Sequence, residues 1–104
     1  MENLSSKDFE LELKNNLDSV LLDVRTRDEY DESHIPNSII LDIRNPQEFM
    51  DGIENLDKTK SYYVYCHSGV RSVKACQIMS SFGFESLFNL IGGISEWTGS
   101  KNSN

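Results

Sequence analysis

The stretch from Tyr65 to Ser72, which reads YCHSGVRS, contains residue types that could carry out nucleophilic chemistry. Cys66 stands near its start, small residues follow, and Arg71 stands near its end. The preceding run, SYYVY, is typical of a buried strand, and the following segment, SVKACQIMSSFGF, is typical of a helix ended by glycine. The pattern therefore places a thiol in the loop that joins a buried strand to a helix.

A loop of this kind can make a thiol reactive. The first N–H groups of a helix have no partner inside it, and the helix dipole directs its positive end toward the loop. Successive amides of the HSGV segment can curl around an anion, because Gly69 leaves the backbone unobstructed. Arg71 adds a permanent positive charge. We therefore predict that Cys66 has a lowered pKa and acts as the catalytic nucleophile. The residues predicted to bind the substrate are His67, Ser68, Gly69, Val70 and Arg71.

Other roles for the two cysteines were weighed. A purely structural role for Cys66 fits poorly with the glycine-containing loop, the arginine and the helix that follow it. Cys76 lies within the predicted helix, and filling the core is favoured for it over a resolving role. The intervening residues separate the two sulfurs by about 15 Å at helical rise, which is beyond disulfide reach. A metal site is not predicted, because Cys66 and His67 are adjacent and the other histidine, His34, lies far away in the sequence.

Charged residues at the end of the first long apolar run provide a second candidate feature. Asp23 and Arg25 should lie near the same sheet edge as Cys66, where they could support the site. A structural ion pair is the favoured interpretation. Solvated surface is the simpler account of Arg44 and Lys74. Trp97 is expected to cover the core.

The elements that must position these residues alternate along the chain. Near-continuous apolar runs at 19–24, 38–43, 61–66 and 86–91 predict strands buried on both faces of a parallel sheet. Helices are predicted between them and at both ends of the chain. The fold class is therefore α/β, with a mainly parallel central sheet flanked by helices on both faces. In such sheets ligands bind beyond the carboxyl ends of the strands, which is where Cys66 falls.

Signals at the ends of the predicted helices support this arrangement. Ser5 can cap a first helix, and Asn45 with Pro46 is a typical helix start. Gly83 suits the end of the helix that follows Cys66. The IGGISEW segment predicts a turn and a last helix, and the polar residues 99–104 are expected to form a frayed tail.

Composition limits the classes of function. The 104 residues fit one domain, and the net charge of -7 makes nucleic acid and anionic membranes unfavourable partners. No run is long enough to span a membrane, and the first residues lack the apolar core of a signal peptide. We therefore expect a cytoplasmic protein with reduced thiols, and a monomer.

Four segments give the chain a clear resemblance to a known family. LLDVRTRDEY, SHIPNSIIL, YVYCHSGVRSVKA and NLIGGISEW follow one another as they do in single-domain rhodaneses, which are sulfurtransferases. The resemblance covers residues 4–98, taken as the domain. It implies a rhodanese-like fold without a cofactor. It also implies that Cys66 accepts sulfur as a persulfide from a small anionic donor such as thiosulfate and passes it to a thiophilic acceptor, which could be a protein. Many relatives carry arginine where His67 stands.

Two other functions remain open at this stage. The chain could be a sulfur carrier or regulatory module that acts on a protein partner, since a carrier needs the same persulfide. It could also be a phosphatase or arsenate reductase, which are related in fold. The six residues from Cys66 to Arg71 form a loop one residue shorter than in those enzymes, and a phosphoryl group needs a wider cradle. The short loop therefore favours sulfur over phosphate.

Overall fold

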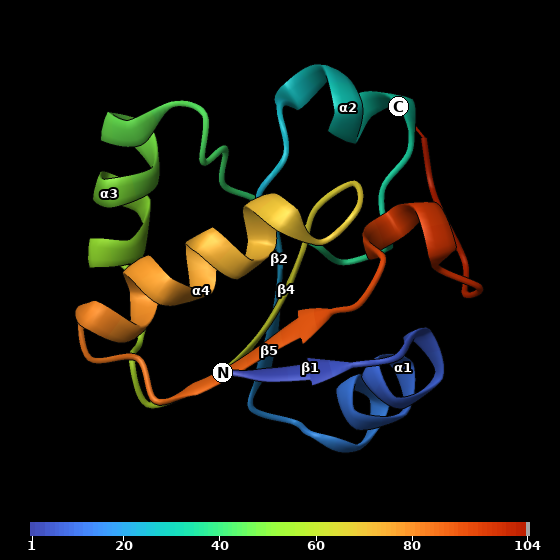
Figure 1. The fold of residues 1–104 in the computed structure, drawn as a ribbon, viewed down its shortest axis with the longest axis horizontal. Coiled ribbons are helices and arrows are strands. Elements are labelled where there is room, and N and C mark those ends of the chain that lie inside the picture. Colours follow the sequence, from blue (N-terminus) through green and yellow to red (C-terminus); the bar gives the residue numbers. More distant parts are fainter. Residues whose placement is uncertain (104) are drawn as a thin grey trace.

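Five strands form a parallel sheet at the centre of the computed structural model, which describes residues 1–103 (Figure 1). Each neighbouring pair of strands is parallel, so the predicted parallel α/β sheet is confirmed. Each predicted apolar run contains one strand. In spatial order the strands are β1 (Glu2–Leu4), β5 (Ser86–Leu90), β4 (Ser61–Tyr65), β2 (Ser19–Asp23) and β3 (Ile39–Ile40).

Strand β1 was not predicted from the sequence. It has three residues, two of them polar, so it shows neither an apolar run nor a clear alternation. It joins the sheet edge through β5, with Leu4 opposite Leu90. The sheet therefore includes residues that precede position 4, where the domain was predicted to begin.

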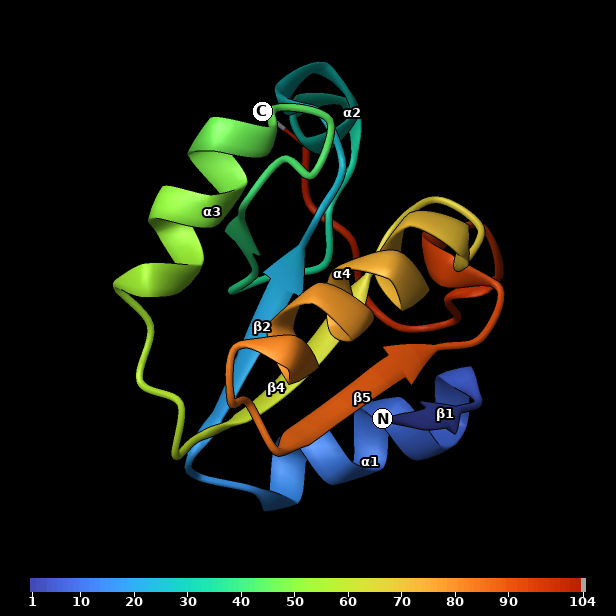
Figure 2. The same cartoon turned by 60° about the vertical axis from the view of Figure 1, so that its left-hand side comes forward.

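The helices lie on both faces of the sheet, as predicted, and their ends follow the sequence signals (Figure 2). Ser5 accepts a hydrogen bond from the N–H of Asp8 at the start of the first helix, and Asn45 caps the third. Gly83 has a φ of 95° just beyond the fourth helix, a conformation that suits glycine. The elements are α1 (Ser6–Asn15), α2 (Arg27–Glu32), α3 (Pro46–Glu54), α4 (Val70–Ser81) and the 3₁₀-helix η1 (Gly93–Glu96).

Strand β4 separates two hydrophobic cores by the alternation of its side chains. Tyr62, Val64 and the following Cys66 pack with α3 and α4 on one face. Tyr63 and Tyr65 pack with α1 and η1 on the other. This central strand is fully sandwiched, which fixes the position of the cysteine at its end.

The C-terminal segment is ordered further than expected. The backbones of His34 and Asn102 exchange two hydrogen bonds of 2.8 Å, and Trp97 Nε1 donates to the carbonyl of Ser100. The prediction of a frayed tail is therefore wrong as far as Asn102. A polar composition hid this pairing, because backbone groups make it. Residue 104 of the predicted tail lies outside the described residues.

Candidate active site

Cys66 follows directly on β4, and backbone and side-chain donors surround its sulfur. The N–H of Gly69 donates to Sγ at 3.0 Å, and Ser72 Oγ lies 3.4 Å from Sγ. Burial of the thiol would by itself raise its pKa, but hydrogen bonds from Ser72 and from the backbone of Gly69 and Ser68 together hold the Cys66 pKa below its ordinary value. The residue is only 1% exposed, so the thiol lies at the base of the loop rather than at the surface.

The loop is held from behind by η1. The N–H groups of Ile94 and Ser95 donate to the carbonyls of Cys66 and His67, at 2.9 and 3.1 Å. Gly93 makes this approach possible, because a Cβ on it would lie 2.4 Å from the carbonyl oxygen of His67. These two bonds fix the backbone of the loop from which the Gly69 amide donates to the sulfur. The backing helix comes from NLIGGISEW, far from the loop in sequence.

The five residues predicted to bind substrate form one loop and the start of α4. Gly69 caps the helix with a φ of 104°, a conformation that L side chains rarely adopt, and Val70 is the first helical residue. His67 and Ser68 are exposed. His67 also lines a cavity of about 320 Å³ together with Arg25 and Glu29. Their assignment to substrate binding stays a prediction.

Arg71 forms a bidentate ion pair with Glu29. The sequence did not reveal Glu29 as a site residue. Arg71 Nη1 and Nη2 lie 2.7 and 2.8 Å from the two carboxylate oxygens. The hydrogen bond from Arg71 is the main cause that lowers the pKa of Glu29 to about 2. Figure 2 shows α2, which carries Glu29, beyond the same ends of the strands as the loop. The positive charge of Arg71 is therefore balanced by a carboxylate of the same chain.

Glu29 also helps to cap the N-terminus of α2. Its carboxylate accepts hydrogen bonds from the N–H and the hydroxyl of Thr26, both at 3.1 Å, while Thr26 Oγ1 accepts from the N–H of Glu29. This is a capping box. One glutamate therefore joins α2 to the loop that holds the cysteine.

Asp23 and Arg25 form a buried pair beside the site. Arg25 Nη2 lies 2.6 Å from Asp23 and also donates to the carbonyl of Ser33. The hydroxyl of Tyr65 donates a hydrogen bond to Asp23 at 2.7 Å and accepts one from the N–H of Ile35. The geometry agrees with the favoured interpretation of a structural pair, which here fixes the backbone between β2 and β3. A role of this pair in supporting catalysis stays a prediction.

Cys76 is buried like Cys66, but its pKa is shifted in the opposite direction. It lies within α4, is fully buried, and packs in the core with Ala75 and Met79. Burial raises the pKa of its thiol to about 12. The interpretation of Cys76 as a core residue agrees with this geometry.

The other residues noted in the sequence have structural surroundings. The ring of His34 stacks on Tyr30 with centroids 3.8 Å apart, and Trp97 packs edge-on against Phe9. Within residues 1–103, no group of three or more His, Cys, Asp or Glu side chains is arranged to hold a metal ion. None of the helices described there has the length and apolar content that crossing a membrane requires.

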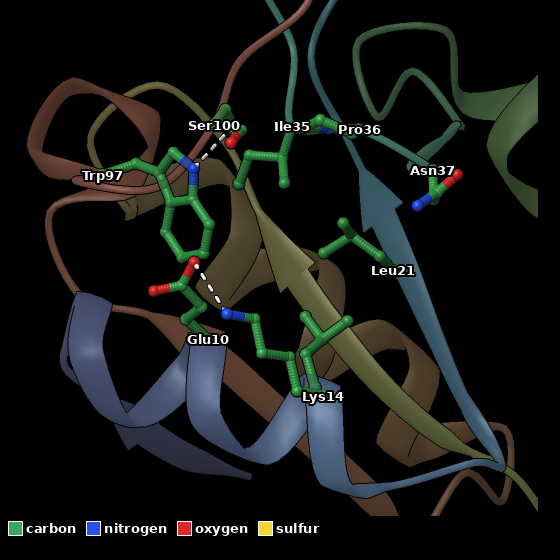
Figure 3. Close-up of a pocket in the computed structure, with 9 residues that line it drawn as sticks. Glu10, Lys14, Leu21, Ile35, Pro36, Asn37, Trp97 and Ser100 are labelled. Atoms are coloured by element: carbon green, nitrogen blue, oxygen red, sulfur yellow. Dashed lines mark hydrogen bonds and ion pairs between the residues drawn. The ribbon is translucent and has the colours of Figure 1, made fainter.

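Two further hollows lie near the helices. One, of about 430 Å³, lies against α1 and is lined by Leu21 and Trp97, with a Glu10–Lys14 ion pair at its edge (Figure 3). It belongs to the face of the sheet opposite Cys66, and it contains no nucleophilic thiol. The other, of about 370 Å³, lies between α3 and α4 and is lined by Arg71 and Lys74. The second hollow therefore adjoins the cysteine loop.

A parallel α/β sheet with a cysteine in the loop between a strand and a helix defines the structural class. Comparison with known proteins defines the family. The rhodanese-like domain model matches residues 7–100, and the chain belongs to this family.

Individual relatives agree with this assignment. The chain is 38% identical over 86 residues to the thiosulfate sulfurtransferase GlpE of Coxiella burnetii, which covers 83% of this chain and 78% of that protein. It is 33% identical to the putative sulfur carrier protein YrkF of Bacillus subtilis, over 76% of this chain and 41% of that protein.

Solved structures show the same fold. A rhodanese-like domain protein from Staphylococcus aureus superposes with a TM-score of 0.85 at 24% identity, over 100% of this chain and 99% of that one. An uncharacterized protein from Saccharomyces cerevisiae gives 0.80 at 30% identity, over 93% and 90%. The predicted rhodanese-like fold is therefore confirmed.

Proposed function

We propose that this protein transfers sulfane sulfur through a persulfide on Cys66. The observation that carries the proposal is the sulfur held by the Gly69 amide and the Ser72 hydroxyl, with a pKa below that of an ordinary thiol. Family membership and relatives named as sulfurtransferases support sulfur transfer as the general class of reaction. A cytoplasmic monomer is part of the proposal and rests on the sequence alone.

In the first step the Cys66 thiolate attacks the outer sulfur of a donor such as thiosulfate. A new sulfur–sulfur bond forms, the bond of thiosulfate breaks, and sulfite leaves with the electron pair. The resulting persulfide carries one negative charge on its outer sulfur. The N–H of Gly69, which caps α4 and bonds Sγ, and the positive end of the helix dipole stabilise this charge.

In the second step a nucleophilic acceptor attacks the outer sulfur of the persulfide. The bond to Sγ breaks, and the Cys66 thiolate leaves with the electron pair. The same hydrogen bonds that lower the pKa of the thiol stabilise this leaving group. The cysteine thus returns to its starting state without a net redox change in the protein.

The test is intact-mass spectrometry after exposure to thiosulfate. We expect the wild-type protein to gain one sulfur atom, which cyanide then removes as thiocyanate. The Cys66→Ser variant should gain none, and the Cys76→Ala variant should gain one. A sulfur adduct that survives in the Cys66→Ser variant would contradict the proposal.

The ion pair of Arg71 with Glu29 favours a second candidate, a sulfur carrier that acts on a protein partner. A neutralised arginine attracts a dianion such as thiosulfate less strongly than a free one. Loading from a protein persulfide, which needs less positive charge, would fit this site. Slow loading by thiosulfate with fast loading by a persulfidated protein would favour the carrier over the free enzyme.

A phosphatase or arsenate reductase is a weaker candidate on the same geometry. The α4 helix begins at Val70, so few loop amides lie between it and Cys66. Arg71, which would bind the oxyanion, is already held by Glu29. Hydrolysis of p-nitrophenyl phosphate at rates above those of the Cys66→Ser variant would revive this alternative.

A further inference from the structure

A line of side-chain hydrogen bonds runs from the buried Cys66 sulfur to the exposed edge of the sheet. Ser72 Oγ lies 3.4 Å from Sγ and donates to Asn89 Oδ1, and Asn89 Nδ2 donates to Asn3 Oδ1 at 3.0 Å. Ser72 is fully buried, and Asn89 is 3% exposed. The line crosses from α4 through β5 to β1, and neither Ser72 nor Asn89 has a role in the function proposed above beyond the contact of Ser72 with the thiol.

The hydroxyl of Ser72 has a single hydrogen to share between two neighbours. Asn89 presents its oxygen to Ser72, because its amide nitrogen donates to Asn3. When Ser72 donates to Asn89, its oxygen can only accept from Cys66, which requires the protonated thiol. When Cys66 is a thiolate, which is an acceptor only, Ser72 must turn its hydrogen to the sulfur and leave Asn89. The two arrangements are mutually exclusive.

We propose that Ser72 is a catalytic residue whose hydroxyl hydrogen switches between Asn89 and the Cys66 sulfur, so that Ser72 stabilises the thiolate and Asn89 restrains its formation. Asn89 is a positioning residue, because it acts on the sulfur only through Ser72. The two neighbours therefore have opposite effects on the same thiol.

The switch follows the sulfur through the reaction, a consequence that rests on the proposed function. The hydrogen lies on Sγ while the thiolate attacks the donor. Once the persulfide has formed, Sγ is neutral and the hydrogen returns to Asn89. When an acceptor takes the outer sulfur, the hydrogen moves again to Sγ, which leaves as a thiolate. Ser72 thus acts on both the nucleophile and the leaving group.

The charged and titratable groups around the cysteine loop lie outside this line of hydrogen bonds. Arg71 at the start of α4 pairs with Glu29 of α2, Arg25 follows β2, and His67 is the next residue of the loop. Substitutions of Ser72 or Asn89 leave all of them in place. A change in the titration of Cys66 in these variants therefore reports on the hydrogen-bond line.

The test measures carbamidomethylation of Cys66 by iodoacetamide against pH, with peptide mass spectrometry to separate it from Cys76. We expect Ser72→Ala to raise the midpoint of the profile and to slow the reaction at neutral pH about tenfold, because a hydrogen bond to a charged sulfur is lost. Asn89→Leu should lower the midpoint and speed the reaction severalfold. Asn3 is exposed and can turn to water.

Controls keep the test decisive. Ser81→Ala removes a hydroxyl from the other end of α4, where it bonds the carbonyl of Ile78, and should leave the profile unchanged. If circular dichroism shows that Asn89→Leu does not fold, Asn89→Val replaces it, because valine suits a strand. Valine also offers no acceptor for the Ser72 hydrogen, so that variant should likewise lower the midpoint.

Shifts of the same sign in Ser72→Ala and Asn89→Leu, or no shift in Ser72→Ala, would overturn the switch. With Asn89→Val, an unchanged or raised midpoint would do the same. Alkylation requires no sulfur donor. The switch can therefore fail while sulfur transfer holds, and sulfur transfer can fail while the switch holds.

Discussion

Replacing Glu29 by glutamine should weaken the fold and free Arg71 at the same time. Glutamine keeps an oxygen for the backbone of Thr26 but loses the charge that pairs with the guanidinium. The pKa of Glu29 is about 2 against an ordinary 4.5. At about 1.4 kcal/mol for each tenfold change in an ionisation constant, this sets a ceiling of about 3 kcal/mol. Both side chains are partly exposed, 19% and 28%, so solvent screening reduces the expected loss to about 1–2 kcal/mol.

The loss should depend on pH in a defined direction. Because the pKa of Glu29 is lower in the folded state, its contribution is fully present above about pH 4.5 and disappears as the pH falls toward about 2. Urea unfolding of wild type and Glu29→Gln at several pH values from 7 to 3 measures this. The two free energies of unfolding should differ by about 1–2 kcal/mol at pH 7 and converge in acid.

A matched control removes a charge from the same turn of α2. Asp28 is exposed and, like Glu29, lies in the first turn of the helix. The Asp28→Asn variant should lose no more than a few tenths of a kcal/mol, from the helix dipole alone. A gap between wild type and Glu29→Gln that is equally small, or that does not change with pH, would refute the stabilising role of the ion pair.

Kinetics give the second half of the prediction. With the carboxylate gone, Arg71 regains its full charge at the loop, and persulfide formation from thiosulfate should be several-fold faster than in wild type. Stopped-flow mixing with thiosulfate measures it. A slower reaction would show that Glu29 holds Arg71 in its working position, and the idea that the carboxylate competes with the donor would be wrong.

Further predictions follow from the same geometry. Iodoacetamide at neutral pH should modify Cys66 before Cys76, because both thiols are almost unexposed and differ in the direction of their pKa shifts. Equal rates in a peptide map would contradict the prediction that the loop activates Cys66. Arg71→Ala should raise the Cys66 pKa and slow sulfur transfer. The activity of Arg71→Lys should be intermediate, because lysine keeps the charge but lacks the planar donor geometry of the guanidinium. Full activity in Arg71→Ala would show that the arginine has only a structural role. Gly93→Ala should slow sulfur transfer at least tenfold and lower the unfolding midpoint, because its methyl group meets the carbonyl of His67; wild-type activity would show that the loop tolerates displacement. Moderate inert salt should hold or raise the rate of thiosulfate capture by a chain of net charge -7, and a steep fall would show a locally basic entrance.

The sequence predicted the elements that have strong local signals. Strands β2, β4 and β5 come from apolar runs and lie inside the sheet, as predicted. The run at 38–43 was expected to be buried on both faces, but β3 is a two-residue edge strand in which Ile39 is 51% exposed. Asn45 with Pro46 marked a helix start that the structure bears out. Strand β1 had no such signal, because its pairing with β5 depends on residues more than eighty positions away. Local patterns do not encode the partner of a short polar strand.

The candidate site, like the fold, could be predicted from the sequence only in part. The loop from Cys66 to Arg71 is continuous in sequence, so its position between strand and helix could be predicted. The residues from other elements that contact this loop could not be predicted. Glu29 reads as an ordinary charge on a short helix, and Asn89 as an interruption in an apolar strand. A polar residue within such a strand is the one signal that could have revealed Asn89, because a buried amide requires partners.

The burial of Cys76 has a consequence for how the protein survives oxidants. The lowered pKa of Cys66 favours the thiolate, which is the form that peroxides convert to sulfenic acid. A nearby thiol normally rescues the sulfenic acid by forming a disulfide. The chain has two cysteines, and the second is locked in the core in its protonated form. Among these 104 residues, therefore, no second thiol is placed to rescue an oxidised Cys66. Repair would then use thiols of other molecules, and without them further oxidation leads to irreversible sulfinic acid.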